Sequence, residues 1–241
     1  MSQNDSPPDL LTIRNLSYIP RGVSVLKDIN LTVHYHRLTA IVGADGAGKT
    51  TLLKAVAGLV RPITGEIYFQ GEPIHNLPAW EIVSRGVVYV PEGMRVFPQM
   101  SVLENLEIGA YCQRQGIAER LQRVLGIFPE LRDRLTLAAG LLSGGQQRMV
   151  TLGRGLMPDP RLLLLDEPFM GLSPKLVNRF CDSFRNLARF GITLLISGQH
   201  IHRVLKIAEQ AYILEEGKIT CSGAGRDLLQ NRHLQEILFI G

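Results

Sequence analysis

A glycine-rich loop between an apolar run and a helix-like segment constrains the fold of this chain more than any other feature. Residues 43–50 read GADGAGKT and match the pattern G-x-x-x-x-G-K-T at every fixed position. The run LTAIVG that leads into the loop has the composition of a buried parallel strand, and the following TTLLKAVAGL carries apolar residues at helical spacing. Since a strand, a glycine loop and a helix occur in this order, we predict an α/β fold.

The loop has the chemistry of a polyphosphate cradle. Its glycines let backbone N–H groups converge on phosphate oxygens, and the helix that follows adds its positive N-terminal end. Lys49 supplies a charge for the β- and γ-phosphates, and the Thr50 hydroxyl is placed to ligate Mg²⁺. We therefore predict an ATP-binding site made by Gly43, Ala44, Asp45, Gly46, Ala47, Gly48, Lys49, Thr50 and Thr51.

A second apolar run ends in two acids. Residues 161–167 read RLLLLDE, in which Asp166 is placed to hold Mg²⁺ and Glu167 follows at the tip of the strand. A carboxylate at the tip can orient and polarise an attacking water, so Glu167 and Lys49 are predicted catalytic residues. Two acids also end many ordinary core strands, but their combination with the glycine loop favours the functional interpretation.

The remaining pattern indicates one core with a helical insert. Residues 86–92 and 192–197 are predicted to be further buried strands, and residues 211–223 a hairpin that turns at Glu216 and Gly217. A helix with Leu176, Phe180, Phe184 and Leu187 on one face precedes Gly191 as a C-terminal cap. We expect a disordered tail at 1–8, a core at 9–92 and 159–222, a helical subdomain at 93–158 and a C-terminal helical extension at 223–241.

Composition limits the classes of partner. The formal charge of +4 and the pI near 9.1 favour anionic partners, but no basic run points to nucleic acid. The cysteines Cys112, Cys181 and Cys221 are widely separated, which favours free thiols in a reducing compartment. Neither a signal peptide nor an apolar run long enough to cross a bilayer is present, so we expect a cytosolic chain unless another subunit brings it to a membrane.

A third motif points to a family. Residues 141–148 read LLSGGQQR, in which Ser143 is a good helix N-cap and two glycines leave N–H groups bare at a helix start. An ordinary glycine turn would look similar, but this one lies shortly before LLLLDE, as in ABC-type ATPases. From about residue 10 to 241 the chain resembles an ABC transporter nucleotide-binding subunit, which has a P-loop NTPase (RecA-like) core with an inserted α-helical subdomain.

The resemblance implies how such a subunit works. Two subunits pack head to tail, and each ATP lies between the phosphate loop of one and the signature motif of the other. Ser143, Gly144, Gly145 and Gln146 would then face the γ-phosphate bound at Lys49 of the partner subunit. Closure on ATP and release after hydrolysis drive transmembrane permease subunits, which the helical insert would contact. The expected location is peripheral, on the cytoplasmic side of the inner membrane.

A narrower resemblance is to the ATPases of branched-chain amino-acid importers, in particular the shorter, LivF-like subunit. YVPEGMRVFPQMSVLENL, PRLLLLDEPFMGLSP and LQEILFIG carry this likeness. Glu92 stands where most ABC ATPases have the glutamine that links the nucleotide to the coupling helix, so it is a predicted nucleotide and metal contact. Urea importers and lipopolysaccharide-export ATPases are close relatives, which leaves the cargo open.

Several positions depart from the common family pattern. Gln199 stands in place of a histidine and is predicted to hydrogen-bond the γ-phosphate, while Gly198 replaces an acid. His200 and His202 follow, and we expect them to be solvent-facing residues at a helix start. The position of the adenine-stacking aromatic aligns with Pro20. Either Tyr18 substitutes for that aromatic or the stacking is weak, and the sequence favours Tyr18.

The acid in the loop is a further departure, because the family usually has asparagine at the position of Asp45. We expect a solvated Asp45, since the backbone holds the phosphates. Ser173 replaces the usual aspartate of the loop after Glu167, a loop that approaches the partner's phosphate loop. An Asp45–Ser173 hydrogen bond between subunits would restore a contact between these two loops. The residue at position 173 would then be the donor and the residue at position 45 the acceptor, the reverse of the family's asparagine and aspartate.

Two other interpretations compete. A soluble ABC ATPase acting on DNA or ribosomes would need long coiled-coil arms or two ATPase halves, and 241 residues leave no room for them. A regulatory subunit that has lost hydrolysis is disfavoured by intact Lys49, Asp166, Glu167 and LSGGQ. The departures at Asp45, Pro20 and Gly198 keep this interpretation open. A GTPase is disfavoured because no N-K-x-D motif occurs.

Overall fold

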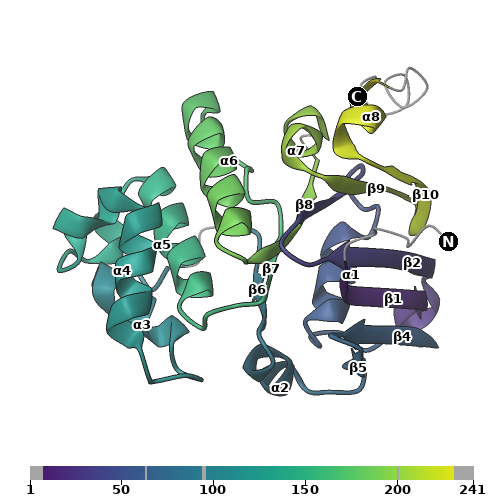
Figure 1. Cartoon of the computed structure of the whole chain (residues 1–241), viewed down its shortest axis with the longest axis horizontal. Coiled ribbons are helices and arrows are strands. Elements are labelled where there is room, and N and C mark those ends of the chain that lie inside the picture. The colour runs from purple at the N-terminus through teal and green to yellow at the C-terminus, as the bar shows by residue number, and fades with distance from the viewer. Residues whose placement is uncertain (1–7, 63, 94–95, 200, 231–241) are drawn as a thin grey trace, which may run out of the picture.

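The computed structural model describes residues 8–62, 64–93, 96–199 and 201–230. Its strands form two sheets that enclose helix α1 (Lys49–Val56), with a group of helices at one end of the molecule (Figure 1). The N-terminal tail predicted at 1–8 and the end of the extension predicted at 223–241 lie largely outside the described residues. Pro8 is described, and its carbonyl accepts a hydrogen bond of 3.1 Å from the N–H of Tyr35.

The larger sheet has the strand order β10-β9-β3-β8-β7-β6. Strands β3, β6, β7, β8 and β9 run parallel, which requires crossover connections between them, and helices form part of these connections. Strand β10 pairs antiparallel with β9. Both faces of the central strands are covered, which explains their unbroken apolar sequences. The strands are β3 (Leu38–Val42), β6 (Val87–Val90), β7 (Leu162–Leu165), β8 (Thr193–Gly198), β9 (Gln210–Glu215) and β10 (Lys218–Gly223).

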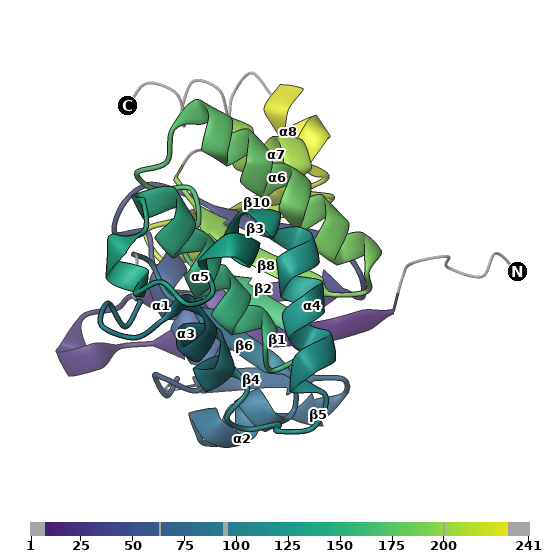
Figure 2. The same cartoon turned by 90° about the vertical axis from the view of Figure 1, so that its left-hand side faces the viewer.

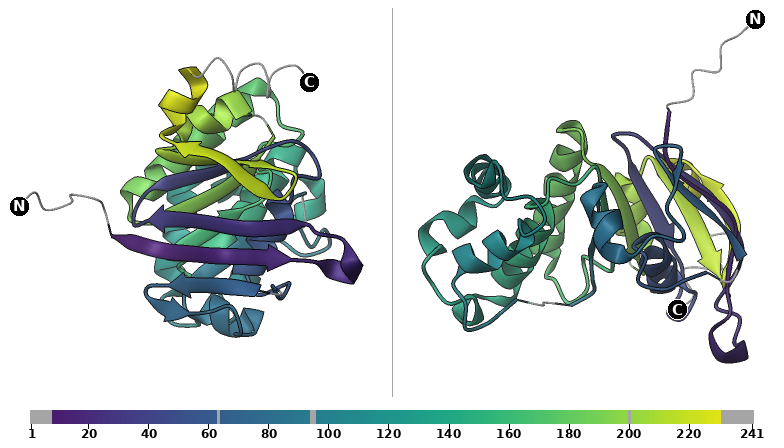
Figure 3. Two further views of the ribbon diagram at one scale, coloured as in Figure 1. Left: turned by 90° about the vertical axis from the view of Figure 1, so that its right-hand side faces the viewer. Right: turned by 90° about the horizontal axis from the view of Figure 1, so that it is seen from below.

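The smaller sheet is antiparallel, with the order β2-β1-β4-β5. It consists of β1 (Asp9–Tyr18), β2 (Leu26–His34), β4 (Thr64–Phe69) and β5 (Glu72–Pro73), and Figure 3 shows it covering one end of the molecule. This sheet was not predicted from the sequence. Its signal was the period-two alternation of β2, in which Leu31 and Val33 are buried and Asn30 is exposed. Its apolar face packs with α1 against the parallel sheet.

The helical insert contains α3 (Val102–Gly109), α4 (Ile117–Ile127) and α5 (Gly144–Leu156), all within 93–158 (Figure 2). The predicted helical face of α4 packs inward through Val124 and Leu125, followed by Phe128. Short 3₁₀ turns at Pro129–Arg134 and Ala139–Leu141 connect α4 to α5. A single isolated bridge between Ser101 and Ala138 is the β-pairing recorded in this part of the described chain.

The remaining helices are α2 (Ala79–Ser84), α6 (Pro174–Arg189), α7 (Ile201–Ile207) and α8 (Gly225–Gln230), with a 3₁₀ turn at Pro20–Gly22. The apolar face of α6 is buried through Phe180, Phe184 and Leu187, as its spacing predicts. Ser173 caps its start, and Gly191, with a φ of 87°, follows its end. The hairpin β9–β10 turns at Glu216 and Gly217, both with positive φ, as a type I′ turn requires.

No helix in the described ranges is long and apolar enough to cross a membrane. The three cysteines are free, and burial raises the pKa of the Cys181 thiol.

Candidate nucleotide site

The predicted phosphate loop opens into a hollow of about 630 Å³ at the carboxyl ends of the parallel strands. Ten of the predicted site residues line this hollow, from four separate segments of the chain, and two residues that were not predicted line it as well. The lining residues are Val25, Asp45, Gly46, Ala47, Gly48, Lys49, Thr50, Thr51, Glu92, Glu167, Met170 and Gln199.

Two glycines of the loop are required by its geometry. A Cβ on Gly43 would lie 2.1 Å from the carbonyl oxygen of Leu214 on β9, so any side chain there would push the loop off the sheet. Gly48 has a φ of 107°, which side chains rarely allow, and it immediately precedes the first residue of α1. The loop therefore turns tightly enough to aim the bare N–H groups of α1 at the hollow.

Lys49 is held at the centre of this loop. Its ammonium donates hydrogen bonds to the carbonyl oxygens of Gly43 at 2.8 Å and Ala44 at 3.0 Å. It also forms an ion pair of 3.3 Å with Oε1 of Glu167, and both side chains are almost fully buried. The positive charge is thus fixed where the loop would hold a phosphate chain.

Asp166 is the acceptor for three hydroxyl groups. Its Oδ1 accepts from Thr50 at 3.0 Å and from Ser197 at 2.6 Å, and its Oδ2 accepts from Tyr89 at 2.8 Å. Tyr89 on β6 and Ser197 on β8 were not predicted, because strand order alone brings them beside β7. These contacts fix the carboxylate next to the Thr50 hydroxyl.

The Thr50 hydroxyl oxygen and the Asp166 carboxylate are hard ligands that fit Mg²⁺. This ion usually takes one or two protein ligands and fills the rest of its shell with water and phosphate. In the described part of the chain no group of three or more His, Cys, Asp or Glu side chains forms a metal cluster. The Thr50 hydroxyl and the Asp166 carboxylate are two ligands of the kind that a metal bound together with a polyphosphate takes from a protein.

Glu167 has an unusual backbone conformation, with a φ of 44°. Its N–H donates to Ser197 Oγ at 3.1 Å, and its Oε2 accepts from the N–H of Gln199 at 3.1 Å. The conformation turns the side chain into the hollow, and such strain is common where a reacting group must be aimed. A buried carboxylate in this place can accept a proton from, and orient, a water.

Comparison with known proteins identifies the family. Residues 26–170, more than half of the chain, match the family model described as ABC transporter.

The chain belongs to the ABC transporter family.

Its relatives agree with this assignment. The chain is 36% identical over 228 residues to the high-affinity branched-chain amino acid transport ATP-binding protein BraG of Pseudomonas aeruginosa, covering 94% of this chain and 98% of that protein. It is 33% identical over 234 residues to the lipopolysaccharide export system ATP-binding protein LptB of Haemophilus influenzae, with 95% and 96% covered. The crystal structure of the ADP conformation of MJ1267, an ATP-binding cassette of an ABC transporter, superposes with a TM-score of 0.89 at 27% identity, covering 97% of this chain and 99% of that one.

The predicted class of enzyme and the predicted fold are therefore confirmed. This chain is an ABC transporter ATPase with the α/β fold of an ATP-binding cassette, and it binds ATP. Within this cassette, the phosphate loop and the Lys49–Glu167 ion pair line the same hollow.

The signature motif of this cassette lies away from that hollow. Ser143 caps α5 in a reciprocal capping box, accepting from the N–H of Gln146 while its own N–H donates to Gln146 Oε1 at 3.1 Å. Ser143 and Gly144 are exposed, and in Figure 1 α5 lies toward the left end while α1 lies to the right. None of Ser143, Gly144, Gly145 and Gln146 lines the hollow of the same chain.

Tyr18 is not brought to the hollow. It packs partly buried against the apolar cluster between the two sheets, and Val25, at the entry to β2, lines the hollow instead. Pro20, which stands where the family has the stacking aromatic, lies in the 3₁₀ turn between β1 and β2. The position of Val25 could not be read from a motif, because an aliphatic residue carries no stacking signal.

Gln199 lines the hollow, and its surroundings explain the glycine beside it. Its side-chain nitrogen lies 3.9 Å from the sulfur of Met170. A Cβ on Gly198 would lie 2.7 Å from Cγ2 of Val204 on α7, so close helix packing requires a glycine there. His202 is exposed on α7 and does not line the hollow, as expected, whereas His200 lies outside the described residues.

Asp45 is exposed at the mouth of the hollow, as expected for a solvated acid. Ser173 is exposed as well, and its Oγ accepts from the N–H of Leu176 at 3.5 Å, which leaves the hydroxyl proton available to a partner.

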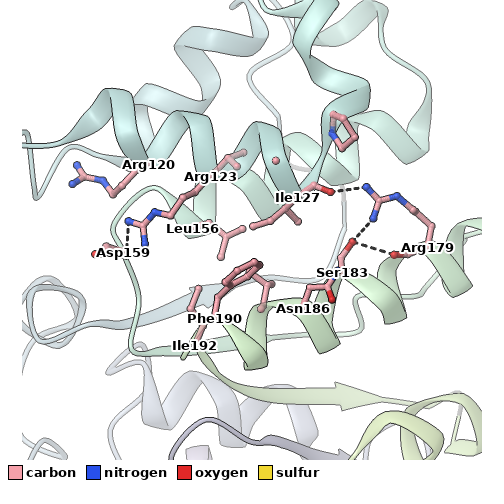
Figure 4. A pocket seen from close by; sticks show the side chains of 14 residues that line it. Arg120, Arg123, Ile127, Leu156, Asp159, Arg179, Ser183, Asn186, Phe190 and Ile192 are labelled. Atoms are coloured by element: carbon pink, nitrogen blue, oxygen red, sulfur yellow. Dashed lines mark hydrogen bonds and ion pairs between the residues drawn. The ribbon is translucent and has the colours of Figure 1, made fainter.

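A second hollow, of about 580 Å³, separates the insert from α6 (Figure 4). Its floor is apolar, and ion pairs bridge it at both ends. At one end Arg179 on α6 donates to the Ile127 carbonyl, to Ser183 Oγ at 2.7 Å and to Glu130 at 3.0 Å. At the other end Arg123 pairs with Asp159 at 2.9 Å. These bonds tie the insert to the core, and none of the predicted site residues lies there.

Proposed function

We propose that this cassette hydrolyses ATP in the hollow around Lys49. Glu167 orients the attacking water, Lys49 holds the β- and γ-phosphates, and the side chain of Gln199 contacts the γ-phosphate. The observation that carries this proposal is the placement of the Glu167 carboxylate, buried at 6% exposure between the Lys49 ammonium and the Gln199 N–H. In this position the carboxylate faces the place where a water would attack the γ-phosphate of an ATP held by the loop.

Thr50, Asp166 and Glu92 would hold Mg²⁺, which when bound neutralises charge on the phosphates. The hydrogen bonds from Tyr89 and Ser197 support the proposal, since they keep the Asp166 carboxylate beside the Thr50 hydroxyl. Glu92 lines the same hollow from the loop after β6.

The active unit in this proposal is a dimer with another ATP-binding subunit, either a second copy or a sister chain. Ser143, Gly144, Gly145 and Gln146 face the ATP held at Lys49 of the other subunit. The exposed start of α5 supports this arrangement, because the N–H groups of Gly144 and Gly145 at a helix start suit a phosphate. Neither glycine lines the hollow of its own chain.

The subunit would power import of branched-chain (hydrophobic) amino acids through separate permease subunits, from a peripheral position on the cytoplasmic side of the inner membrane. The 36% identity to BraG, over nearly the whole of both chains, supports this cargo. The 33% identity to LptB makes lipopolysaccharide export the second candidate. No nucleic acid takes part in either.

The insert is the proposed contact with the permease. It exposes apolar side chains that a partner could cover, namely Phe97, Ile108 and Tyr111. A hollow of about 520 Å³ between α2 and the segment after α3, lined by Val83, Arg85 and Cys112, lies beside them.

Turnover of Mg²⁺-ATP by the purified chain, measured across protein concentration, tests the enzymatic part. Activity that rises with concentration and is lost in Glu167→Gln is the expected result. ATP binding without turnover, even after the sister subunit is added, would support a regulatory subunit that has lost hydrolysis.

Reconstitution with the permease subunits in proteoliposomes tests the cargo. We expect ATP-dependent uptake of labelled leucine, isoleucine or valine that requires Glu167. Extraction of lipopolysaccharide from the membrane without amino-acid uptake would assign the second candidate instead.

A further inference from the structure

Arg148, the fifth residue of α5, is buried inside the protein. Its side chain is only 5% exposed, although Ser143 and Gly144 at the start of the same helix are exposed. It lines no part of the nucleotide hollow, so neither the phosphate-loop chemistry nor the signature motif accounts for it.

The guanidinium joins α5 to two loops that border the nucleotide. Nη2 donates to the carbonyl oxygen of Met170 at 2.9 Å, and Nη1 donates to that of Gly93 at 3.5 Å. Met170 follows β7 and Glu167, while Gly93 follows β6 and Glu92. Both Met170 and Glu92 line the hollow, so a single side chain spans the backbone of both loops.

These acceptors are neutral, and they leave the charge of the guanidinium uncompensated. Nε of Arg148 has no hydrogen-bond partner among the described residues. Burial lowers the pKa of Arg148, and the charge of Glu92 opposes that effect. The charge of Glu92 therefore favours the protonated guanidinium, and Glu92 also lines the nucleotide hollow.

Keeping a poorly compensated cation buried costs free energy, and an apolar side chain of similar volume often replaces such a group without loss of stability. Stability alone therefore does not explain why an arginine occupies this position. Its fork of donors can hold two carbonyls at a fixed separation, which an apolar side chain cannot do.

We infer that Arg148 is a positioning residue for ATP hydrolysis, which holds the loop of Glu92 and the loop of Met170 in register with the start of α5. This inference rests on the proposed function and adds a residue to it. A shift of Glu92 toward the nucleotide moves the Arg148 guanidinium, and through α5 moves Ser143 and Gly144. Those residues are the ones proposed to face the ATP of the partner subunit, so Arg148 links the two ATP sites of the dimer.

The test compares Arg148→Met, Arg148→Lys and Arg226→Met in whichever assembly the wild-type chain hydrolyses ATP, alone or with its sister subunit. Arg226 is an exposed arginine on α8, far from the hollow in sequence, and serves as the matched control. ATP affinity, kcat and the midpoint of thermal unfolding are measured for each variant.

We expect Arg148→Met to lower kcat by about tenfold while the dissociation constant for ATP changes by less than about threefold. Arg148→Lys retains the charge but not the fork, so it should recover only part of the loss. Arg226→Met should match the wild type. Combining Arg148→Met with Glu92→Gln should cost less than the sum of the two single effects, because the pair acts together.

Wild-type kcat in Arg148→Met, whatever its unfolding midpoint, would overturn the inference. If Arg148→Met does not fold, wild-type kcat in Arg148→Lys would overturn it as well, since lysine cannot hold both carbonyls. Failure of the proposed function gives a different result, in which neither the wild type nor Arg226→Met turns over ATP in any assembly.

Discussion

Lys49 and Glu167 form a buried ion pair, with 3.3 Å between the ammonium nitrogen and Oε1. The lysine belongs to the phosphate loop and the glutamate to the end of β7, so the pair spans the proposed reaction centre. A pair this deeply buried is strongly destabilising to break by removing one charge. Here, however, Lys49 also donates to two loop carbonyls, and Glu167 also accepts from the Gln199 N–H, so each group keeps a partner when the pair opens.

The first prediction concerns Glu167. Glu167→Gln should lower kcat by about 100-fold or more, because an amide cannot accept the proton of the attacking water. ATP affinity should stay within a few-fold, since Lys49 keeps its loop carbonyls. Single-turnover hydrolysis and equilibrium ATP binding measure the two effects. A variant that still hydrolyses ATP at the wild-type rate would assign the general base to another group.

The second prediction concerns Tyr89, which donates to Asp166 at 2.8 Å. Tyr89→Phe should raise the Mg²⁺ concentration needed for half-maximal turnover by several-fold, because a freer carboxylate holds a metal less well. Tyr212→Phe is the matched control, since that tyrosine also hydrogen-bonds, but to the Thr32 backbone on the smaller sheet. An equal Mg²⁺ requirement in both variants would mean that the Tyr89 hydroxyl does not help Asp166 to hold the metal.

The third prediction concerns Asp45 and Ser173 in the dimer. Both residues are exposed, and the Ser173 hydroxyl, although it caps α6, keeps its proton to donate to a partner. Dimer affinity in the presence of ATP, measured for Asp45→Ala, Ser173→Ala and the double variant, should show coupling of about 0.5 kcal/mol or more. Effects that simply add would mean that the two side chains do not meet across the interface.

The fourth prediction is a pH dependence at the tie between the insert and α6. Burial by itself would raise the pKa of Glu130. The hydrogen bond from Arg179, a hydrogen bond from the backbone of Glu130 itself and the charge of Arg179 together outweigh burial and hold the pKa below its ordinary value. The pair therefore adds stability above the unfolded-state pKa of a glutamate and loses it as the pH falls through the lower folded-state pKa.

Hydrogen exchange of α4 against pH measures this tie. The wild type should lose protection of α4 in that acidic window, whereas Glu130→Gln should show reduced protection already at neutral pH and little further loss. Glu119→Gln, which alters an acid in the first turn of α4 itself, is the control. Identical pH profiles for Glu130→Gln and the wild type would show that the ion pair does not hold the insert.

The sequence by itself determined the features that are contiguous along the chain. The phosphate loop, the acids at the end of β7, the capped start of α5 and the helical insert each lie within one continuous segment. Residue type and spacing dictate their local conformation, so the sequence alone predicts them. The positions of Lys49, Glu167 and Gln199 around one hollow also agree with the sequence prediction.

Only the tertiary structure decided which distant residues complete these segments. Tyr89 and Ser197 reach Asp166 because β6 and β8 flank β7, and Val25 lines the hollow where Tyr18 was predicted. Arg148 lies between two loops that are remote from it in sequence. The physical reason is that sheet order and helix packing are set by burial across the whole chain, and no local pattern records which strand becomes a neighbour.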